Sequence, residues 1–207
     1  LCSLTDKARC AAEEQMQALS SQGLRVIAIA AAHPENEAAI PAAITDCRLT
    51  LLGLVGLADP PRESVKNDIA VCNRAGIRVV MITGDNGITA SAIAQKIGVP
   101  GSDNIITGEA LEAMSDEELR VAVKTASIFS RVIPAHKMRI VKAFQENGAI
   151  VAMTGDGVND APALKYADIG IAMGKRGSEV SREAADLILL DDNFTTIVET
   201  VRDGRRI

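Results

Sequence analysis

From Glu63 to the end of the chain, short apolar runs alternate with stretches in which apolar residues recur at helical spacing. Alternation of this kind predicts a parallel sheet that is covered by helices on both faces. We therefore expect an α/β, Rossmann-like fold for this part. The expected strands are 77–83, 127–130, 149–154, 169–173 and 187–190, and the expected helices are 63–75, 87–97, 116–124, 134–147, 160–166, 178–185 and 194–203.

The first part of the chain has a different pattern. Residues 5–22 have helical periodicity, and the apolar runs 24–31 and 47–57 predict two strands of a small sheet, with a loop and short helix over 33–43. The string Asp59-Pro60-Pro61-Arg62 then interrupts the pattern, because consecutive prolines cannot continue a strand ladder. We expect a small α+β unit over 1–58 and the larger unit over 59–207.

Composition excludes several classes of protein. The net charge is −5, Lys and Arg are spread along the chain, and Trp is absent, so nucleic-acid binding is not expected. The four cysteines form no Cys-x-x-Cys pair and are predicted to be reduced thiols outside any zinc site. No apolar run reaches the roughly 20 residues of a membrane-spanning helix. The start at Leu1 rather than Met indicates a piece of a longer protein.

Polar residues follow three of the expected strands. They are Thr83-Gly84-Asp85, Ser130-Arg131 and the stretch from Thr154 to Asp160. In a parallel sheet these ends meet at one edge, where ligands bind. Glycine amides there can approach a phosphate, and the carboxylates of Asp156 and Asp160 suit Mg²⁺.

Lys137, at the start of a helix, adds a positive charge that could neutralise phosphate oxygens. Electrostatic positioning of this kind supplies most of the catalysis in phosphoryl transfer. Each element also has a simpler interpretation. Thr-Gly-Asp is common in turns, Asp160 could cap the following helix, and Lys137 could be a solvated charge. Gly-Asp-Gly-Val-Asn-Asp after a buried strand is harder to explain without a cation or hydrogen bonds.

The string TGDGVNDAPALK (Thr154 to Lys165) closely resembles the hinge-region signature of P-type ATPases, which belong to the haloacid dehalogenase superfamily. Further strings occur in the order typical of that family, and the resemblance extends from about Gly23 to the end of the chain. The forms DPPR and DDNF are most similar to the subgroup of calcium and sodium/potassium pumps. The strings are ADPPRESV, MITGDN, FSRVIPAHKMRIV, ADIGIAMG and DDNFTTIV.

The resemblance implies roles for individual residues. Asp156 would bind Mg²⁺, and Asp160 would support the same metal site. Lys137 would neutralise the transferred phosphoryl group, which the loop Thr83, Gly84 and Asp85 would grip. Nucleotide contacts, with ATP as the substrate, would come from Arg25, Arg131 and Asn159.

The family's nucleophilic aspartate lies in an Asp-Lys-Thr-Gly-Thr loop, and this string does not occur in the chain. The resemblance therefore implies the C-terminal part of a nucleotide-binding domain (1–58) followed by a phosphorylation domain without its nucleophile strand and loop (59–207). Such a piece alone would be inactive. Its partners would be the actuator, membrane and remaining nucleotide domains of the same protein, at the cytoplasmic face of a membrane, and the transported cation, with Ca²⁺ favoured. A soluble phosphatase of the superfamily and a non-catalytic module that binds phosphate or Mg²⁺ are the alternatives.

Overall fold

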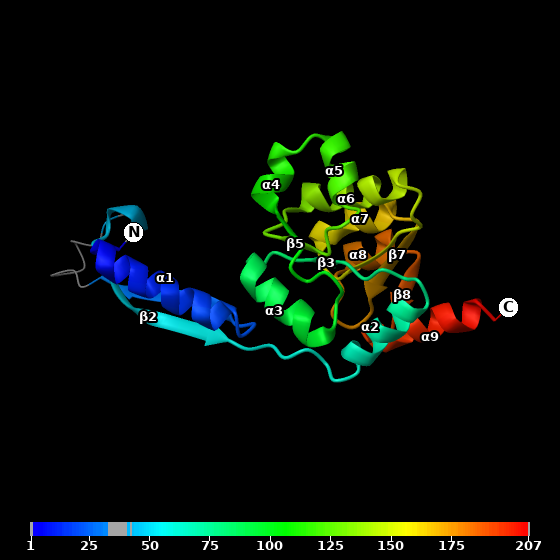
Figure 1. Cartoon of the computed structure of the whole chain (residues 1–207), viewed down its shortest axis with the longest axis horizontal. Coiled ribbons are helices and arrows are strands. Elements are labelled where there is room, and N and C mark those ends of the chain that lie inside the picture. The colour runs from blue at the N-terminus through cyan, green and yellow to red at the C-terminus, as the bar shows by residue number, and fades with distance from the viewer. Residues whose placement is uncertain (1, 33–40, 42, 207) are drawn as a thin grey trace. The chain divides into compact units, whose positions relative to one another are not determined.

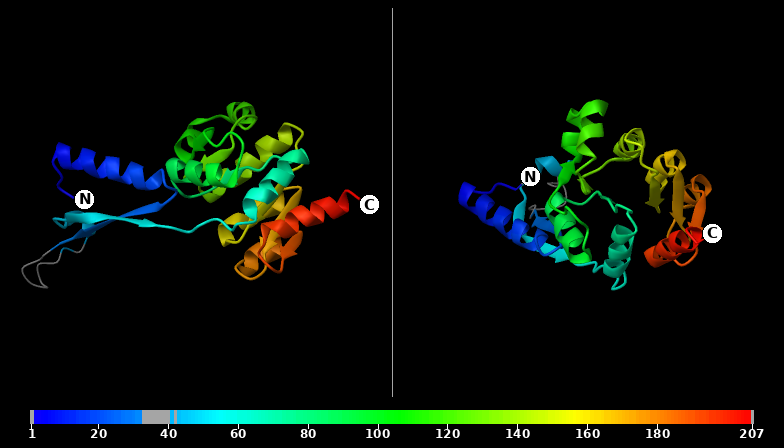
Figure 2. Two further views of the ribbon diagram at one scale, coloured as in Figure 1. Left: turned by 60° about the horizontal axis from the view of Figure 1, so that its bottom comes forward. Right: turned by 45° about the vertical axis from the view of Figure 1, so that its right-hand side comes forward.

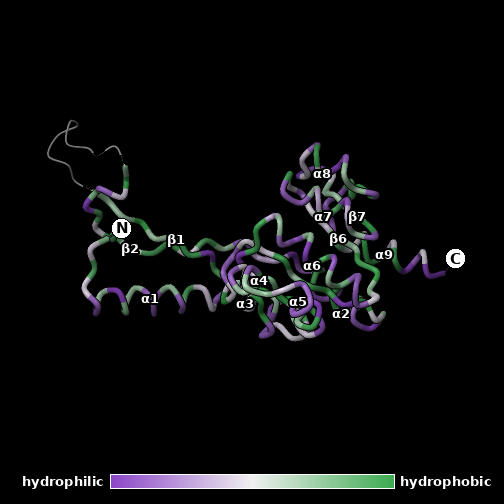
Figure 3. Tube along the Cα trace, turned by 90° about the horizontal axis from the view of Figure 1, so that it is seen from above, coloured by the Kyte–Doolittle hydropathy of each residue, from purple (hydrophilic) through white to green (hydrophobic). Residues whose placement is uncertain are grey.

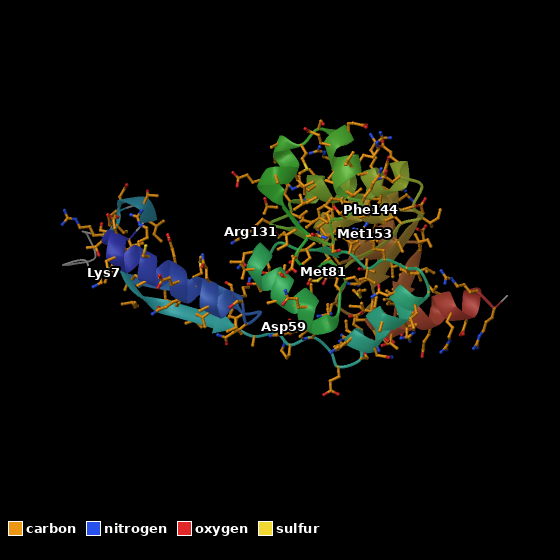
Figure 4. The ribbon with its side chains drawn as sticks, in the orientation of Figure 1. Lys7, Asp59, Met81, Arg131, Phe144 and Met153 are labelled. Carbon is orange, nitrogen blue, oxygen red and sulfur yellow. The ribbon has the colours of Figure 1, made fainter. Side chains whose placement is uncertain are left out.

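The structure, a computed structural model, describes residues 2–32, 41 and 43–206. The chain divides into two compact units between Pro60 and Pro61, inside the proline-containing string of the sequence. Asp59 lies on the extended segment that follows the last strand of the first unit (Figure 4). The loop and short helix expected over 33–43 lie almost entirely outside the described residues; a 3₁₀ helix follows at Ile44–Asp46.

The first unit is a helix that packs along a two-stranded antiparallel sheet, as the periodicity predicts (Figure 1). Helix α1 (Asp6–Ser20) begins at Thr5, whose hydroxyl accepts a hydrogen bond from the amide of Ala8. Strands β1 (Arg25–Ala31) and β2 (Thr50–Leu57) pair along their whole length. Both strands are largely hydrophobic, whereas α1 alternates between polar and apolar residues (Figure 3).

The second unit contains two parallel sheets of three strands each. The first has the order β3-β5-β4, with β3 at Met81–Ile82, β4 at Ile105–Thr107 and β5 at Ile128–Ser130. The second has the order β6-β7-β8, with its strands side by side (Figure 2). These strands are Ala152–Gly155, Ile169–Met173 and Leu187–Leu189.

Helices cover both faces of the first sheet, as two neighbouring residues of β5 demonstrate. Phe129 packs into a core with α5 (Asp116–Ala122) and α6 (Pro134–Glu146), whereas Ile128 packs with α2 (Val65–Arg74) and α3 (Gly87–Ile97). Successive side chains of a strand point to opposite faces, so these two cores lie on opposite sides of β5.

Helix α6 also joins the first sheet to the second. Its residue Ile140 belongs to the Phe129 core, while the next residue, Val141, packs with Met153 of β6 and Leu164 of α7 (Ala161–Tyr166). The side chains of Phe144 and Met153 lie in the interior of this unit (Figure 4). The remaining helices of the described chain are α4 (Gly108–Ala113), α8 (Glu179–Ala184), α9 (Phe194–Gly204) and the 3₁₀ helix η3 (Val158–Asp160).

The fold differs from the sequence expectation in three respects. The sheet is divided into two parts. Of the expected strand 77–83, Met81 and Ile82 form a ladder, with Ile128 and Phe129 of the three-residue strand β5, and β3 has no second strand partner among the described residues. The elements β4 and α4 were not expected, since both are too short to show a periodic pattern. Within the described residues, no helix has the length and apolarity required to cross a membrane.

Candidate active site

The centre of the candidate site is a contact between Lys137 and Asp160. Lys137 is in the first turn of α6, and Asp160 ends η3, the turn that follows β6. The Lys137 ammonium donates a hydrogen bond to Oδ1 of Asp160, and Oδ2 accepts from the backbone amides of Asp156 and Gly157 at 3.2 and 3.0 Å. Both oxygens of this buried carboxylate are therefore occupied by donors from the protein.

These donors determine the charge of Asp160. Burial alone would raise the pKa of its carboxyl group, because a low-dielectric environment disfavours the charged form. The hydrogen bond from Lys137 and those from the Gly157 and Asp156 amides outweigh this effect, and the pKa lies below its usual range. Asp160 is consequently a carboxylate that holds the Lys137 ammonium at a fixed position.

Asp156 has a different environment. Its backbone carbonyl accepts from the amide of Ser178 at 2.7 Å and from the hydroxyl of Ser181 at 3.2 Å, so α8 fixes its position. Its side chain is exposed and has no hydrogen-bonding or ionic partner among the described residues. The structure thus anchors the backbone of Asp156 and leaves its carboxylate oxygens free, on the same cavity lining as Lys137 and Asp160.

Ser178 and Ser181 also position the site, although no sequence pattern singles them out. Ser178 caps α8 by accepting from the Ser181 amide, and Ser181 is fully buried. The spacing Ser-x-x-Ser at the start of a helix indicates a cap. The hydrogen bond from the Ser181 hydroxyl to the Asp156 carbonyl depends on tertiary structure, and the local sequence does not indicate it.

The loop Thr83-Gly84-Asp85 follows β3, as expected. The Thr83 hydroxyl accepts from the amide of Asp85 at 3.1 Å, and Asn86 then caps α3 by accepting from the amide of Thr89. This loop is joined to the segment before α6. The amides of Arg131 and Val132 donate to the carbonyls of Asp85 and Thr83 at 3.1 and 3.2 Å. The loop and the helix that carries Lys137 therefore form one connected framework.

The residues expected at the nucleotide are more dispersed. Arg131 is exposed at the end of β5 and has a backbone φ of +54°, in the left-handed region (Figure 4). Asn159 is exposed in η3. Arg25 starts β1 in the first unit, so it belongs to a separate compact part of the chain. Their contacts with a nucleotide stay predictions.

The side chains of the site meet part of the requirements of a Mg²⁺ site. No group of three or more His, Cys, Asp or Glu side chains that could hold a metal occurs in the part of the chain that is described. Mg²⁺, however, typically uses one or two carboxylates and completes its shell with waters and substrate phosphates. The free carboxylate of Asp156 fits this pattern. Asp160 fits it less directly, because Lys137 and two amides occupy its oxygens.

A family model for haloacid dehalogenase-like hydrolases matches residues 6–168, which include both loops and Lys137. The chain belongs to the haloacid dehalogenase-like hydrolase family. The α/β fold with parallel sheets agrees with this assignment and confirms the fold class predicted from the alternating pattern.

This haloacid dehalogenase-like chain has curated relatives in both bacteria and fungi. It is 50% identical over 197 residues to the calcium-transporting ATPase of Bacillus subtilis, a match that covers 94% of this chain and 22% of the relative. It is 48% identical over 200 residues to the endoplasmic reticulum calcium ATPase srcA of Aspergillus fumigatus, covering 90% and 20%. The cation-transporting ATPase pma1 of Synechocystis is 48% identical over 198 residues, covering 94% and 22%.

These relatives confirm the resemblance to calcium-pump-like ATPases that the motifs indicate. The chain spans about a fifth of the length of the curated relatives that it matches.

Proposed function

We propose that this chain is part of the cytoplasmic catalytic region of a P-type ATPase that transports a cation, with Ca²⁺ as the transported ion. Residues 59–207 would be its phosphorylation domain and residues 1–58 the C-terminal part of its nucleotide-binding domain. The observation that carries the proposal is the Lys137–Asp160 pair beside the free carboxylate of Asp156. It occurs in a chain about half identical to calcium-transporting ATPases.

The chemistry would be transfer of the γ-phosphoryl group of ATP to an aspartate elsewhere in the longer protein. The Lys137 ammonium, held in place by Asp160, would neutralise charge on the transferred group. The Thr83 hydroxyl and the amides of its loop would orient the phosphoryl oxygens. Asp156 would hold Mg²⁺, which supplies further charge neutralisation when bound. These residues would thus position and stabilise the reacting group.

The separation of the two sheets supports the proposal that a further strand comes from elsewhere in a longer protein. Within the described part of the chain, strands β3 and β6 each pair with another strand on one side only. A cavity of about 950 Å³ is lined by residues of both, including Ile82 and Met153, and extends to Lys137 and Asp156. An added strand would satisfy the unpaired edges, which are otherwise prone to non-specific pairing. Its end would lie beside Lys137, where the proposed nucleophile is required.

ATP-dependent uptake of labelled Ca²⁺ into membrane vesicles that contain the full-length protein tests the proposal. Lys137→Ala and Asp156→Ala are expected to lower uptake at least a hundredfold, because each removes charge stabilisation from the transition state. Lys142→Ala is the matched control, since Lys142 lies on the same helix but only forms an exposed pair with Glu146 at 3.7 Å. Wild-type uptake by Lys137→Ala would overturn the site assignment. ATP hydrolysis without Ca²⁺ uptake would mean a different transported ion.

A further inference from the structure

His136 lies between the candidate site and α4, and its side chain is almost completely buried. Its ring nitrogen Nδ1 accepts a hydrogen bond from the backbone amide of Ile133 at 3.3 Å, and Nε2 lies 2.8 Å from Oε1 of Glu112. A backbone amide can only donate, so Nδ1 must be unprotonated. The proton of the neutral ring is therefore on Nε2, which donates to Glu112.

This histidine supplies the cap of α6. Ile133 occupies the position before the helix, and its aliphatic side chain cannot accept a bond from a helix amide. His136 instead reaches back from the third position of the helix to the Ile133 amide, as Glu or Gln does in a capping box. The next residue is Lys137, so the cap fixes the turn from which the ammonium group reaches Asp160.

The segment before α6 is also held from the side of α4. The Arg131 carbonyl packs against Gly108, the first residue of α4, where an added Cβ would lie 2.1 Å from that oxygen and 3.4 Å from Cε1 of His136. Glu112 projects from the same helix to the imidazole. Arg131 and Val132 donate hydrogen bonds to the Thr83–Asp85 loop. Helix α4 therefore contacts a segment that is bonded to this loop on one side and leads into the helix of Lys137 on the other.

We propose that His136, oriented by Glu112, is a positioning residue that sets the place of Lys137 relative to the Thr83 loop during phosphoryl transfer. The proposal rests on the function proposed above. The positioning requires that Nδ1 accept the bond from the Ile133 amide, which is the contact that joins the imidazole to the start of α6. Small displacements of a catalytic group can lower rates by large factors.

The experiment is acid-quenched, single-turnover phosphorylation of the full-length protein from labelled ATP and Mg²⁺. His136→Leu keeps the apolar bulk but has no acceptor, whereas His136→Gln can accept from Ile133 and donate to Glu112. At saturating ATP we expect His136→Leu to phosphorylate about tenfold more slowly, in line with the loss of a helix cap. The KM for ATP should not change, and His136→Gln should recover most of the rate.

Glu112→Ala tests the second half of the pair without a change in the core, since the Glu112 side chain is 64% exposed. It should lower the rate about threefold, in line with the loss of one modest hydrogen bond. Glu109→Ala, an exposed acid on the same helix, is the control and should phosphorylate like the wild type. Hydrogen exchange of the full-length protein gives a readout independent of activity: amides of 131–137 should exchange faster in His136→Leu than in His136→Gln.

Wild-type phosphorylation by His136→Leu, or equal losses in the Leu and Gln variants, would overturn the proposal. If His136→Leu did not fold, the comparison of Glu112→Ala with Glu109→Ala would test the proposal. Equal phosphorylation rates in these two variants would overturn it. If the wild-type protein formed no acid-stable phosphoenzyme, this result would contradict the proposed function and, with it, the role of His136. If the wild-type protein were labelled and the His136 and Glu112 variants were labelled at the same rate, only the role of His136 would be contradicted.

Discussion

At the scale of single residues, two buried serines at the ends of one strand illustrate how hydrogen bonding decides stability. Ser130 is fully buried and its hydroxyl has no hydrogen-bond partner among the described residues. Ser127 is buried nearby, and its hydroxyl donates to the carbonyl of Pro100 at 2.7 Å. Burial removes the hydrogen bonds of a hydroxyl to water. A hydrogen bond within the protein offsets this loss, whereas a buried hydroxyl without a partner lowers the stability of the fold.

We therefore expect opposite effects of the same substitution at the two serines. Ser130→Ala should raise the free energy of unfolding by about 1 kcal/mol, and Ser127→Ala should lower it by about 1 kcal/mol. Urea denaturation of the chain, followed by circular dichroism, measures both. A destabilising effect of Ser130→Ala as large as that of Ser127→Ala would show that the Ser130 hydroxyl has a partner after all.

Asp160 makes stability depend on pH in a predictable direction. Its native pKa is lowered, whereas an unfolded aspartate has a pKa of about 3.9. The carboxylate therefore contributes stability that is fully present above the unfolded pKa and is lost as the pH falls through the lowered native value. The difference in unfolding free energy between wild type and Asp160→Asn should be largest at neutral pH and should shrink at acid pH. A difference that grows below the unfolded pKa would contradict this account.

At the scale of elements, the turn from β6 into η3 is the most constrained part of the site. A Cβ on Gly155 would lie 2.5 Å from Cβ of Asp160, whereas one on Gly157 would come no closer than 3.4 Å to the same residue. Both glycines belong to one motif, but only at Gly155 would a side chain collide with Asp160. The close approach allows Asp160 to fold back over the end of the strand.

Alanine substitutions at these two glycines should separate them. Gly155→Ala forces Asp160 aside and should lower the free energy of unfolding by about 1–3 kcal/mol, as expected for overpacking. Gly157→Ala should change it by less than about 0.5 kcal/mol, as is usual for a substitution without a clash. Chemical denaturation of the two variants under identical conditions provides the comparison. Equal losses would mean that the motif is constrained by backbone conformation rather than by the contact.

Elements with a long periodic pattern could be predicted from sequence, and α3 and β7 have the expected bounds. The strand at Ile105–Thr107 and the six-residue helix after it could not, because a periodic signal requires more residues than either contains. In the site, Lys137 and Asp160 were singled out separately. Their contact joins residues 23 positions apart and depends on how α6 packs on β6.

At the scale of the whole molecule, the division into two sheets connects the fold with the proposed function. The larger unit places Lys137, Asp156 and Asp160 on the lining of a cavity that also reaches residues of β3 and β6. Single-sequence patterns could not predict this division, since they identify strands but not which of them are neighbours. In the proposed function, a further strand would come from the rest of a longer protein; the chain spans about a fifth of the length of the relatives that it matches.

The most direct test of the account is acid-quenched phosphorylation of the full-length protein with labelled ATP and Mg²⁺, with and without Ca²⁺. We expect an acid-stable, hydroxylamine-sensitive label that depends on Ca²⁺, is absent in Lys137→Ala, and persists in the Lys142→Ala control. In the proposed mechanism, the Lys137 ammonium would stabilise the charge of the phosphoryl group as the aspartyl-phosphate forms. Absence of any label in the wild-type protein, or full labelling of Lys137→Ala, would contradict the account.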